Sequence, residues 1–283
     1  MAGRTSSHRR TDHNGEKKSM SLKAIWAAGR PVLNGWLSIP NVFTAETMAH
    51  QGWDSLTVDM QHGITDYLSA VPMLTAISTR PVVPVVRVPW LDPGIIMKSL
   101  DAGALGVICP MINNAEEARR FVAALRYPPQ GVRSFGPIRA LLAHGMDYPA
   151  KANDLVTGFA MIETKEALEH LDEIMSVPGL DAIYIGPTDL ALALGAEPRL
   201  DPTDQRVIDT IAHILARAKA HGIRAGIHNA SAEHALKMVG IGFDFVTAGS
   251  DARFVATAAA QTVSTFRSGR GDAAKKTGAG GGY

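Results

Sequence analysis

The sequence has a single cysteine, almost no net charge and no apolar run long enough to cross a membrane. One thiol in 283 residues cannot form an internal disulfide, which is typical of a reducing, cytoplasmic setting. No apolar stretch approaches the roughly 20 residues that a membrane-spanning helix needs. The 28 basic and 27 acidic residues give a net charge of +1, which favours neither a nucleic-acid nor a membrane partner. Any charge that binds a substrate must therefore be local.

The two ends of the chain lack the apolar content of a folded domain. Residues 1–20 are polar and charged and have no apolar core of a secretory signal, so we expect a disordered extension there. Residues 268–283 are rich in Gly, Ala and Lys, and we expect a disordered tail. Residues 21–267 match the roughly 250 residues of a single α/β barrel, and a chain that is 46% hydrophobic can bury one sizeable core.

Eight short apolar runs alternate with helical patterns along the chain. The predicted strands are Leu33–Leu37, Ser55–Asp59, Val82–Arg87, Gly106–Cys109, Gly158–Glu163, Ala182–Ile185, Arg224–Ile227 and Phe245–Thr247. Apolar residues spaced three and four apart predict helices between them, most clearly Ala115–Leu125, Arg206–His221 and Ala232–Val239. Eight apolar strands with crossover helices predict a (β/α)8 TIM barrel of the α/β class. An open doubly wound sheet is the alternative, but its Gly-rich phosphate turn is missing after the first strand.

The longest irregular segment runs from Arg126 to about Asn153. It contains Pro128-Pro129, Gly131 and Gly136-Pro137. A connection of this length in a compact domain is usually functional or disordered. Because it follows the fourth strand and helix, we predict that part of it lies over the barrel mouth, as a lid or a subunit contact.

Polar residues at the carboxyl ends of strands two and three are the first candidates for a site, because chemistry in a parallel barrel collects there. Asp59 and His62 lie three residues apart where the second apolar run stops. Either Asp59 orients and charges His62 as a general base, or Asp59 caps a turn and His62 is a surface residue. Arg87 ends the third strand, where burial is costly unless it is paired or holds an anion. It suits an enolate oxygen, or it pairs structurally with Asp59.

Two carboxylates follow the fifth and sixth strands, at Glu163 and Asp189. From adjacent strands they can coordinate one hard cation, with water and a chelating substrate as further ligands. Each acid also has a structural alternative at the start of a helix. The turn Gly186-Pro187-Thr188 offers backbone N–H groups that suit a substrate carboxylate, although Pro187 donates none.

Four other side chains could have a functional role or simply a structural one. Cys109 lies in an apolar strand and is predicted to be a buried thiol rather than a nucleophile. Lys98 falls in the helix after the third strand, which argues against an imine-forming lysine. His228 follows the seventh strand and faces either the barrel mouth or the packing around it. Trp36 either walls the site or packs the barrel.

Six motifs in order resemble the HpcH/HpaI family of class II, metal-dependent pyruvate aldolases. They are Val58–Gly63, Pro84–Arg87, Asp101–Ala104 with Pro110-Met111, Arg126–Arg133, Ile162–Thr164 and Ile185–Leu190. The resemblance covers roughly Leu22 to Phe266. Six ordered motifs are far more specific than any one of them.

The resemblance implies a barrel of the phosphoenolpyruvate/pyruvate type that exchanges its last helix between subunits of a homo-hexamer, a trimer of dimers. It implies a divalent metal (Mg²⁺, Mn²⁺ or Co²⁺) on Glu163 and Asp189, and no organic cofactor. Arg87 would match the arginine that stabilises the enolate, and His62 with Asp59 the acid–base machinery. Backbone from Gly186 to Asp189 would hold the substrate carboxylate.

The implied reaction is reversible aldol cleavage of 4-hydroxy-2-oxo acids to pyruvate and an aldehyde, with oxaloacetate decarboxylation as a side reaction. Gln61 and Met161 depart from residues that many members carry. The Met-Gln-His-Gly version resembles the branch that accepts hydroxypyruvate, and Gln61 with Trp36 is expected near the substrate. Two other functions stay open: an acyl-CoA lyase of the citrate lyase beta-subunit type, and a non-catalytic protein that binds 2-oxo acids.

Overall fold

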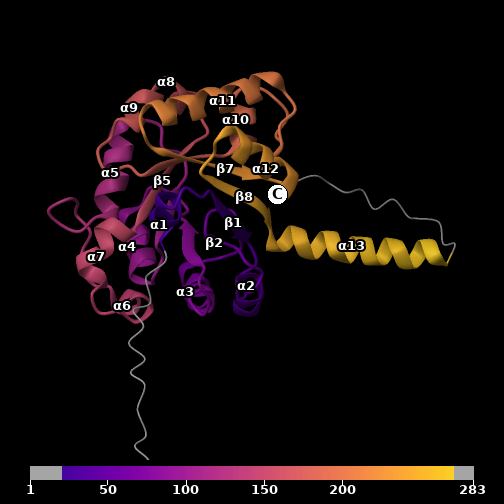
Figure 1. Ribbon diagram of the computed structural model, residues 1–283, viewed down its shortest axis with the longest axis horizontal. Helices are drawn as coiled ribbons and strands as arrows, with labels where there is room; N and C mark the ends of the chain where they lie inside the picture. Colours follow the sequence, from indigo (N-terminus) through magenta and orange to yellow (C-terminus); the bar gives the residue numbers. More distant parts are fainter. Residues whose placement is uncertain (1–20, 271–283) are drawn as a thin grey trace, which may run out of the picture.

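The computed structural model describes residues 21–270, and its centre is a closed barrel of eight parallel strands in the order β1 to β8 (Figure 1). The strands are β1 Val32–Leu37, β2 Ser55–Asp59, β3 Val83–Arg87, β4 Gly106–Cys109, β5 Thr157–Ile162, β6 Ala182–Ile185, β7 Arg224–Asn229 and β8 Phe245–Ser250. The predicted (β/α)8 barrel and its eight strands are confirmed. Strand β7 continues two residues beyond the prediction and includes His228, whereas β5 ends one residue before Glu163.

Helices follow each strand, as the three- and four-residue spacing predicts, and one more helix, α1, precedes the first strand. They are α1 Leu22–Ala27, α2 Val42–Ala49, α3 Tyr67–Ile77, α4 Pro93–Asp101, α5 Ala115–Leu125, α6 Ile138–His144, α7 Tyr148–Leu155, α8 Lys165–Glu169, α9 Leu171–Met175, α10 Pro187–Ala193, α11 Gln205–Ala220, α12 Ala232–Ile241 and α13 Asp251–Gly269. Helix α13 includes Ser268 and Gly269 and is capped by Arg270, all of which composition assigned to the tail. The rest of the expected disordered segments lies outside the described residues. No helix within residues 21–270 is long and apolar enough to span a bilayer.

Alternation along the strands produces two apolar layers. Side chains that point inward, among them Val85, Phe159 and Tyr184, fill the interior of the barrel. Side chains that point outward, such as Val86 and Ile183, pack against the helices. Helix α1 closes the amino end, where the ring of Trp26 packs on Phe159 with centroids 6.0 Å apart. The filled interior leaves the carboxyl end as the place for a site.

The segment between α5 and β5 does not lie over the barrel mouth, so that prediction is wrong. Helix α5 starts at the carboxyl end of β4 and returns to the amino end, where the Arg126 guanidinium donates to the Val156 carbonyl and to Asp181, just before β5 and β6. Two short helices, α6 and α7, occupy much of the segment. Turn residues suggested irregular chain, whereas α6 packs on α4 and reaches α3 through Arg139, and α7 packs on α6. Local sequence does not reveal these contacts.

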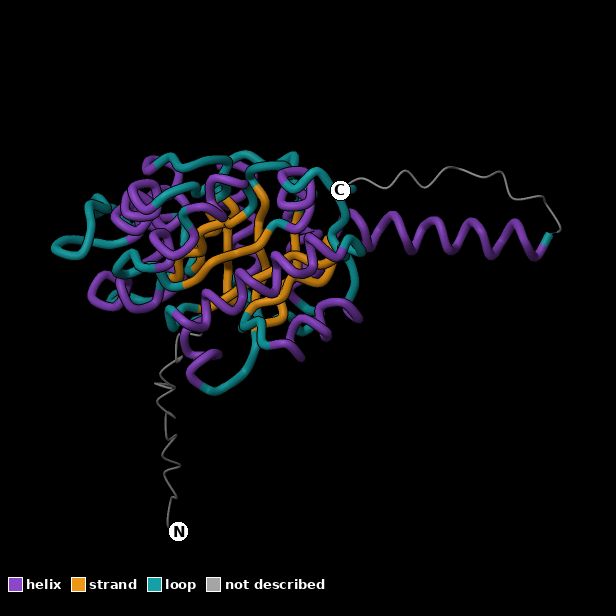
Figure 2. Tube along the Cα trace, turned by 90° about the horizontal axis from the view of Figure 1, so that it is seen from above, coloured by secondary structure: helices purple, strands orange, loops and turns teal. Residues whose placement is uncertain are grey.

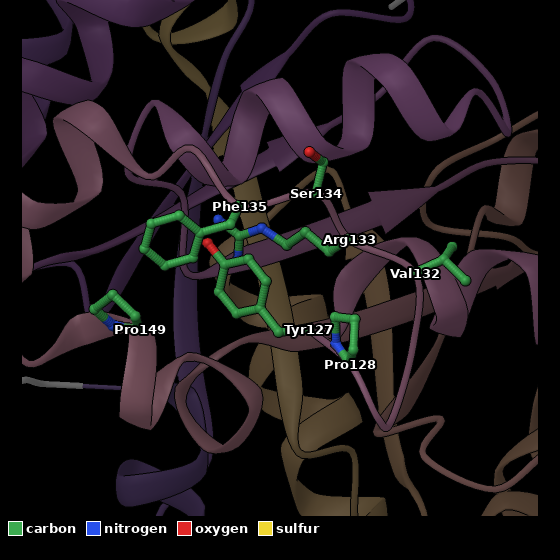
Figure 3. A pocket seen from close by; sticks show the side chains of 7 residues that line it. All are labelled: Tyr127, Pro128, Val132, Arg133, Ser134, Phe135 and Pro149. Carbon is green, nitrogen blue, oxygen red and sulfur yellow. The ribbon is translucent and has the colours of Figure 1, made fainter.

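Arg133 fixes this segment to the barrel through a fully buried guanidinium. Its Nη2 donates to Asp101 Oδ1 at 2.7 Å and its Nη1 to the Tyr148 hydroxyl at 3.0 Å. The guanidinium also lies over the ring of Tyr127, 4.4 Å from its centroid. Figure 3 shows this stack at the wall of a cavity of about 500 Å³ that Phe135 and Pro149 also line. The cavity lies beside the segment that follows α5, away from the carboxyl ends of the strands.

Helix α13 projects away from the barrel (Figures 1 and 2). Asp251 fixes its first turn by accepting the backbone N–H groups of Ser38 and Ile39. Beyond Phe254, which stacks on Trp53, the helix is exposed, including Val263 and Phe266. A cavity of about 770 Å³ opens between its first turns and the start of α12, and Leu33 of β1 is 41% exposed there. A strand leucine exposed to this extent shows that α13 does not cover its own barrel.

Replacement of Asp181 is predicted to lower the stability of the fold, because its carboxylate pairs with a buried arginine. Asp181 accepts from Arg126 at 2.6 Å, from Lys23 at 2.8 Å and from the Gly158 amide. The side chain of Arg126 is only 5% exposed, so D181A leaves a buried charge unpaired and should lower the free energy of unfolding by about 3 kcal/mol.

Urea denaturation of D181A and of a control, D172A, checks this prediction. Asp172 pairs with Arg217 at 2.7 Å on the surface, where the two side chains are 58% and 37% exposed. The control should lose less than about 1 kcal/mol. Equal losses in the two variants would contradict the importance that we assign to burial of Arg126.

Candidate active site

Three predicted site residues meet on the inner wall of the barrel, near the carboxyl ends of β1, β2 and β3. Trp36, Asp59 and Arg87 all point inward, and Asp59 and Arg87 are register partners on neighbouring strands. The Arg87 Nε donates to Asp59 Oδ1 at 2.8 Å, and its Nη2 donates to Asp59 Oδ2 at 2.6 Å. This is the two-pronged geometry that makes an arginine–carboxylate pair strong and directional.

Trp36 completes the arrangement from β1. Its indole N–H donates to Asp59 Oδ2 at 3.2 Å, and the Arg87 guanidinium lies 4.8 Å from its ring centroid. Burial alone would raise the pKa of Asp59, but the hydrogen bond and charge of Arg87 outweigh it and lower that pKa below the ordinary value. Asp59 is therefore a carboxylate that holds Arg87 in one orientation.

Arg87 keeps donor capacity for a ligand. Asp59 occupies Nε and one Nη2 proton, and Nη1 has no hydrogen-bond partner within the described part of the chain. Arg87 can thus fulfil both alternatives raised by the sequence, since it pairs with Asp59 and still has donors for an anion. A guanidinium oriented from one side can present its other donors to a developing oxyanion.

The turn after β2 separates His62 from the carboxylate expected to support it. Asp59 Oδ1 accepts the backbone N–H groups of Gln61 and His62, at 3.0 and 3.3 Å. The imidazole of His62 is exposed. The expectation that Asp59 charges the His62 ring is therefore not met, because Arg87, Trp36 and the turn amides take the carboxylate oxygens. Gly63 packs so closely on the Asp59 carbonyl that no side chain fits there.

Glu163 lies immediately after β5 and is 3% exposed. Its Oε1 accepts the backbone N–H of Met111 at 2.9 Å, and its Oε2 lies against Gly186, where a Cβ would come within 2.5 Å. Burial, and then the negative charge of Asp189, raises the pKa of Glu163 to about 7, against the opposing effects of the Met111 amide and Arg87. The charges of Asp189 and Arg87 thus both act on Glu163.

Glu163 and Asp189 fit a divalent cation. Asp189 is exposed in the first turn of α10, so one acid is buried and the other reaches solvent. A buried carboxyl that repels its neighbour is stabilised in its charged form when a cation sits between the two acids. No group of three or more His, Cys, Asp or Glu side chains within residues 21–270 offers a complete protein-only site. Two carboxylates with water and substrate oxygens remain a normal set for Mg²⁺ or Mn²⁺.

The turn between β6 and α10 brings the other predicted substrate residues beside Glu163. Gly186 caps α10 without a side chain, Pro187 is its first residue, and both are buried. Thr188 is half-buried and precedes Asp189. Asp189 therefore lies in the first turn of a helix, as its structural alternative predicted, and its charge also acts on Glu163. The backbone amides of Thr188 and Asp189 start the helix without a side-chain cap.

The predicted positions of two reactive side chains, Cys109 and Lys98, are confirmed, and one residue was missed. Cys109 is buried, and burial raises the pKa of its thiol. Lys98 lies exposed on α4 with its ammonium over the ring of Tyr67, outside the barrel. Met111 was missed as a partner of Glu163. It has φ +56°, uncommon for a residue other than glycine, and only the Pro110-Met111 motif in the sequence marked this position.

Residues 34–258 match the HpcH/HpaI aldolase/citrate lyase family. A hydroxypyruvate/pyruvate aldolase of Rhizorhabdus wittichii is 46% identical over 246 residues, which are 87% of this chain and 98% of that protein. A 4-hydroxy-2-oxo-heptane-1,7-dioate aldolase of Shigella flexneri is 35% identical over 87% of this chain and 92% of its own. The crystal structure of a family protein from Burkholderia cenocepacia superimposes with a TM-score of 0.81 at 29% identity, covering 87% of this chain and 98% of that one. The chain belongs to the HpcH/HpaI aldolase/citrate lyase family.

Proposed function

We propose that this chain is a metal-dependent aldolase that reversibly cleaves 4-hydroxy-2-oxo acids to pyruvate, or hydroxypyruvate, and an aldehyde. The observation that carries the proposal is the position of Glu163, a buried carboxyl whose Oε2 lies beside Gly186, at the start of the helix that carries Asp189. The aldolase names of the relatives from R. wittichii and S. flexneri support the same reaction type.

Glu163 and Asp189 would hold the cation, which supplies a positive charge for the carbonyl and carboxylate oxygens of the 2-oxo acid when it is bound. The uncapped start of α10, from Gly186 to Asp189, would bind the substrate carboxylate through backbone amides. The oxygen ligands favour a hard divalent ion, and Mg²⁺, Mn²⁺ and Co²⁺ are the candidates that the resemblance implies.

Arg87 would stabilise the negative charge that develops on the carbonyl oxygen as a proton leaves the neighbouring carbon. Its orientation is fixed by Asp59 and Trp36 before substrate arrives, so little reorganisation is required at the moment of reaction. The exposed His62 would take this proton, directly or through a water molecule, and return it in the synthetic direction. Oxaloacetate decarboxylation would follow from the same charge stabilisation.

We also propose that α13 packs on a second copy of the chain, as the resemblance implies. The helix exposes Val255, Val263 and Phe266 at 60%, 48% and 64%. The barrel leaves an apolar opening beside Leu33 that the helix does not fill. A reciprocal exchange would bury both surfaces and is compatible with a trimer of dimers.

Removal of divalent ions should abolish aldol cleavage, and added Mg²⁺, Mn²⁺ or Co²⁺ should restore it. Protons compete for Glu163, whose pKa of about 7 lies above the ordinary 4.5, so cation affinity should fall about tenfold per pH unit below neutrality. Titration of Mn²⁺ into the metal-free protein at several pH values measures this change in affinity.

E163Q is the control, and it should bind Mn²⁺ weakly at every pH. Full activity of metal-free protein would refute the metal role.

R87K should slow the exchange of pyruvate methyl protons with deuterium by on the order of 10²-fold, because lysine lacks the second donor group that the oxyanion would use. Lysine keeps a cation beside Asp59, so the fold should survive. Proton NMR follows the exchange without any aldehyde, and thermal unfolding monitors the fold. Exchange at the wild-type rate would show that Arg87 does not stabilise the enolate.

V263E should reduce the molecular mass measured by light scattering after size-exclusion chromatography, because it places a charge on the proposed contact face of α13. S264E is the matched control. Ser264 lies nine residues after Val255, about half a turn around the helix from it, and should leave the mass unchanged. A wild-type chain that is monomeric at micromolar concentration would contradict the exchange.

A further inference from the structure

His228 lies on the inner wall of the barrel beside the candidate site and has no role in the mechanism above. Two residues before it, Gly226 also points inward, and a Cβ there would come within 2.8 Å of the Tyr184 ring and 3.3 Å of Phe245. Those two aromatic rings fill the layer below. The imidazole of His228 therefore lies above them, near the open end of β7.

The ring of His228 is held from two sides. Its Nδ1 lies 3.2 Å from the Tyr184 hydroxyl, which in turn contacts Thr247 Oγ1 at 2.7 Å. The edge of the imidazole meets Trp36, with centroids 4.7 Å apart. Trp36 is the same ring that carries the Arg87 guanidinium. His228 and the group proposed to stabilise the enolate thus both contact the Trp36 ring.

His228 is a neutral polar group in this position. Burial, and then the positive charge of Arg87, lowers the pKa of the imidazole to about 3. Its Nε2 has no hydrogen-bond partner within residues 21–270, and it is not among their solvent-sealed polar atoms. In a closed barrel whose interior is filled, this nitrogen can be reached only from the mouth. It offers one uncharged hydrogen-bonding atom to a bound molecule.

The other polar groups of the site already match the two fixed parts of a 2-oxo acid. Arg87, Glu163 and Asp189 would serve its carbonyl and carboxylate oxygens, directly or through the cation. The third carbon of the nucleophile carries either hydrogen alone or a hydroxyl group. A neutral imidazole nitrogen pairs well with a hydroxyl, which can donate or accept, and gains nothing from a methyl group. A polar atom left without a partner disfavours the substrate that lacks the hydroxyl.

We propose that His228 is a specificity-determining residue whose free ring nitrogen hydrogen-bonds a hydroxyl on the carbon next to the 2-oxo group. The site would thereby select hydroxylated 2-oxo acids, of the hydroxypyruvate class, over pyruvate. Tyr184 acts as a positioning residue, because its hydroxyl fixes the imidazole through Nδ1. This inference rests on the proposed aldol function.

The test compares kcat/KM for hydroxypyruvate and for pyruvate as nucleophiles, with glycolaldehyde as the fixed acceptor. H228F keeps an aromatic ring against Trp36 but removes the hydrogen bond, and the ratio of the two constants should fall roughly fivefold to tenfold. H228Q retains a polar group and should keep more of the ratio than H228F. Y184F should lower the ratio by a smaller factor. H213F, on the exposed face of α11, is the matched control and should leave the ratio unchanged.

A ratio for H228F within twofold of the wild-type value overturns the proposal. If H228F does not fold, Y184F decides by the same measurement, because loss of the hydroxyl should lower the ratio and an unchanged ratio overturns the claim. Failure of the wild-type protein to join either 2-oxo acid to glycolaldehyde would instead reject the aldol function. Exchange of pyruvate methyl protons in the wild-type protein separates these two failures.

Discussion

The ion pair between Asp59 and Arg87 is the constraint on which the rest of the site depends. Both side chains occupy the interior of a barrel, where an unpaired charge is costly and a two-pronged pair satisfies both partners. The pair also organises its surroundings, because Asp59 takes the Trp36 N–H and the amides that start the turn after β2. One carboxylate thus sets the orientation of the guanidinium, of an aromatic wall and of the backbone that carries His62.

Glu163 is also a buried carboxyl, but unlike Asp59 it has no ion-pair partner among the described residues. It is equally buried, but within residues 21–270 it accepts a hydrogen bond only from the Met111 amide, and Asp189 adds a second negative charge nearby. The unusual φ of Met111 shows that the chain accepts local strain to supply that donor. A carboxylate whose charge is so little balanced by its neighbours is suited to bind a cation. The charge of Asp59 is already balanced by Arg87, so Asp59 is not suited to bind one. The two acids differ in partners rather than in burial, and this difference separates their proposed roles.

Much of the fold was predictable because strand and helix periodicities are local. The eight apolar runs required only alternation and composition, and their order placed Asp59, Arg87, Glu163 and Asp189 at one end of the barrel. The partners of these residues were not predictable. That Asp59 pairs with Arg87 and accepts only the backbone N–H of His62 depends on the directions of side chains on three strands. The course of the segment after α5 depends on Arg126 and Arg133 reaching acids more than thirty residues away in the chain.

The position of His228 follows from the layering of the barrel interior. The rings of Tyr184 and Phe245 occupy the space beside Gly226, and the next inward residue of β7, His228, lies one layer closer to the mouth. Trp36 contacts both His228 and Arg87, so an uncharged imidazole and a permanent cation lie against one aromatic ring. A wall built in this way can distinguish a hydroxyl from a methyl without disturbing the charge balance that Asp59 and Arg87 maintain. Stabilisation of charge and selection of substrate can therefore be assigned to different side chains of the same layer.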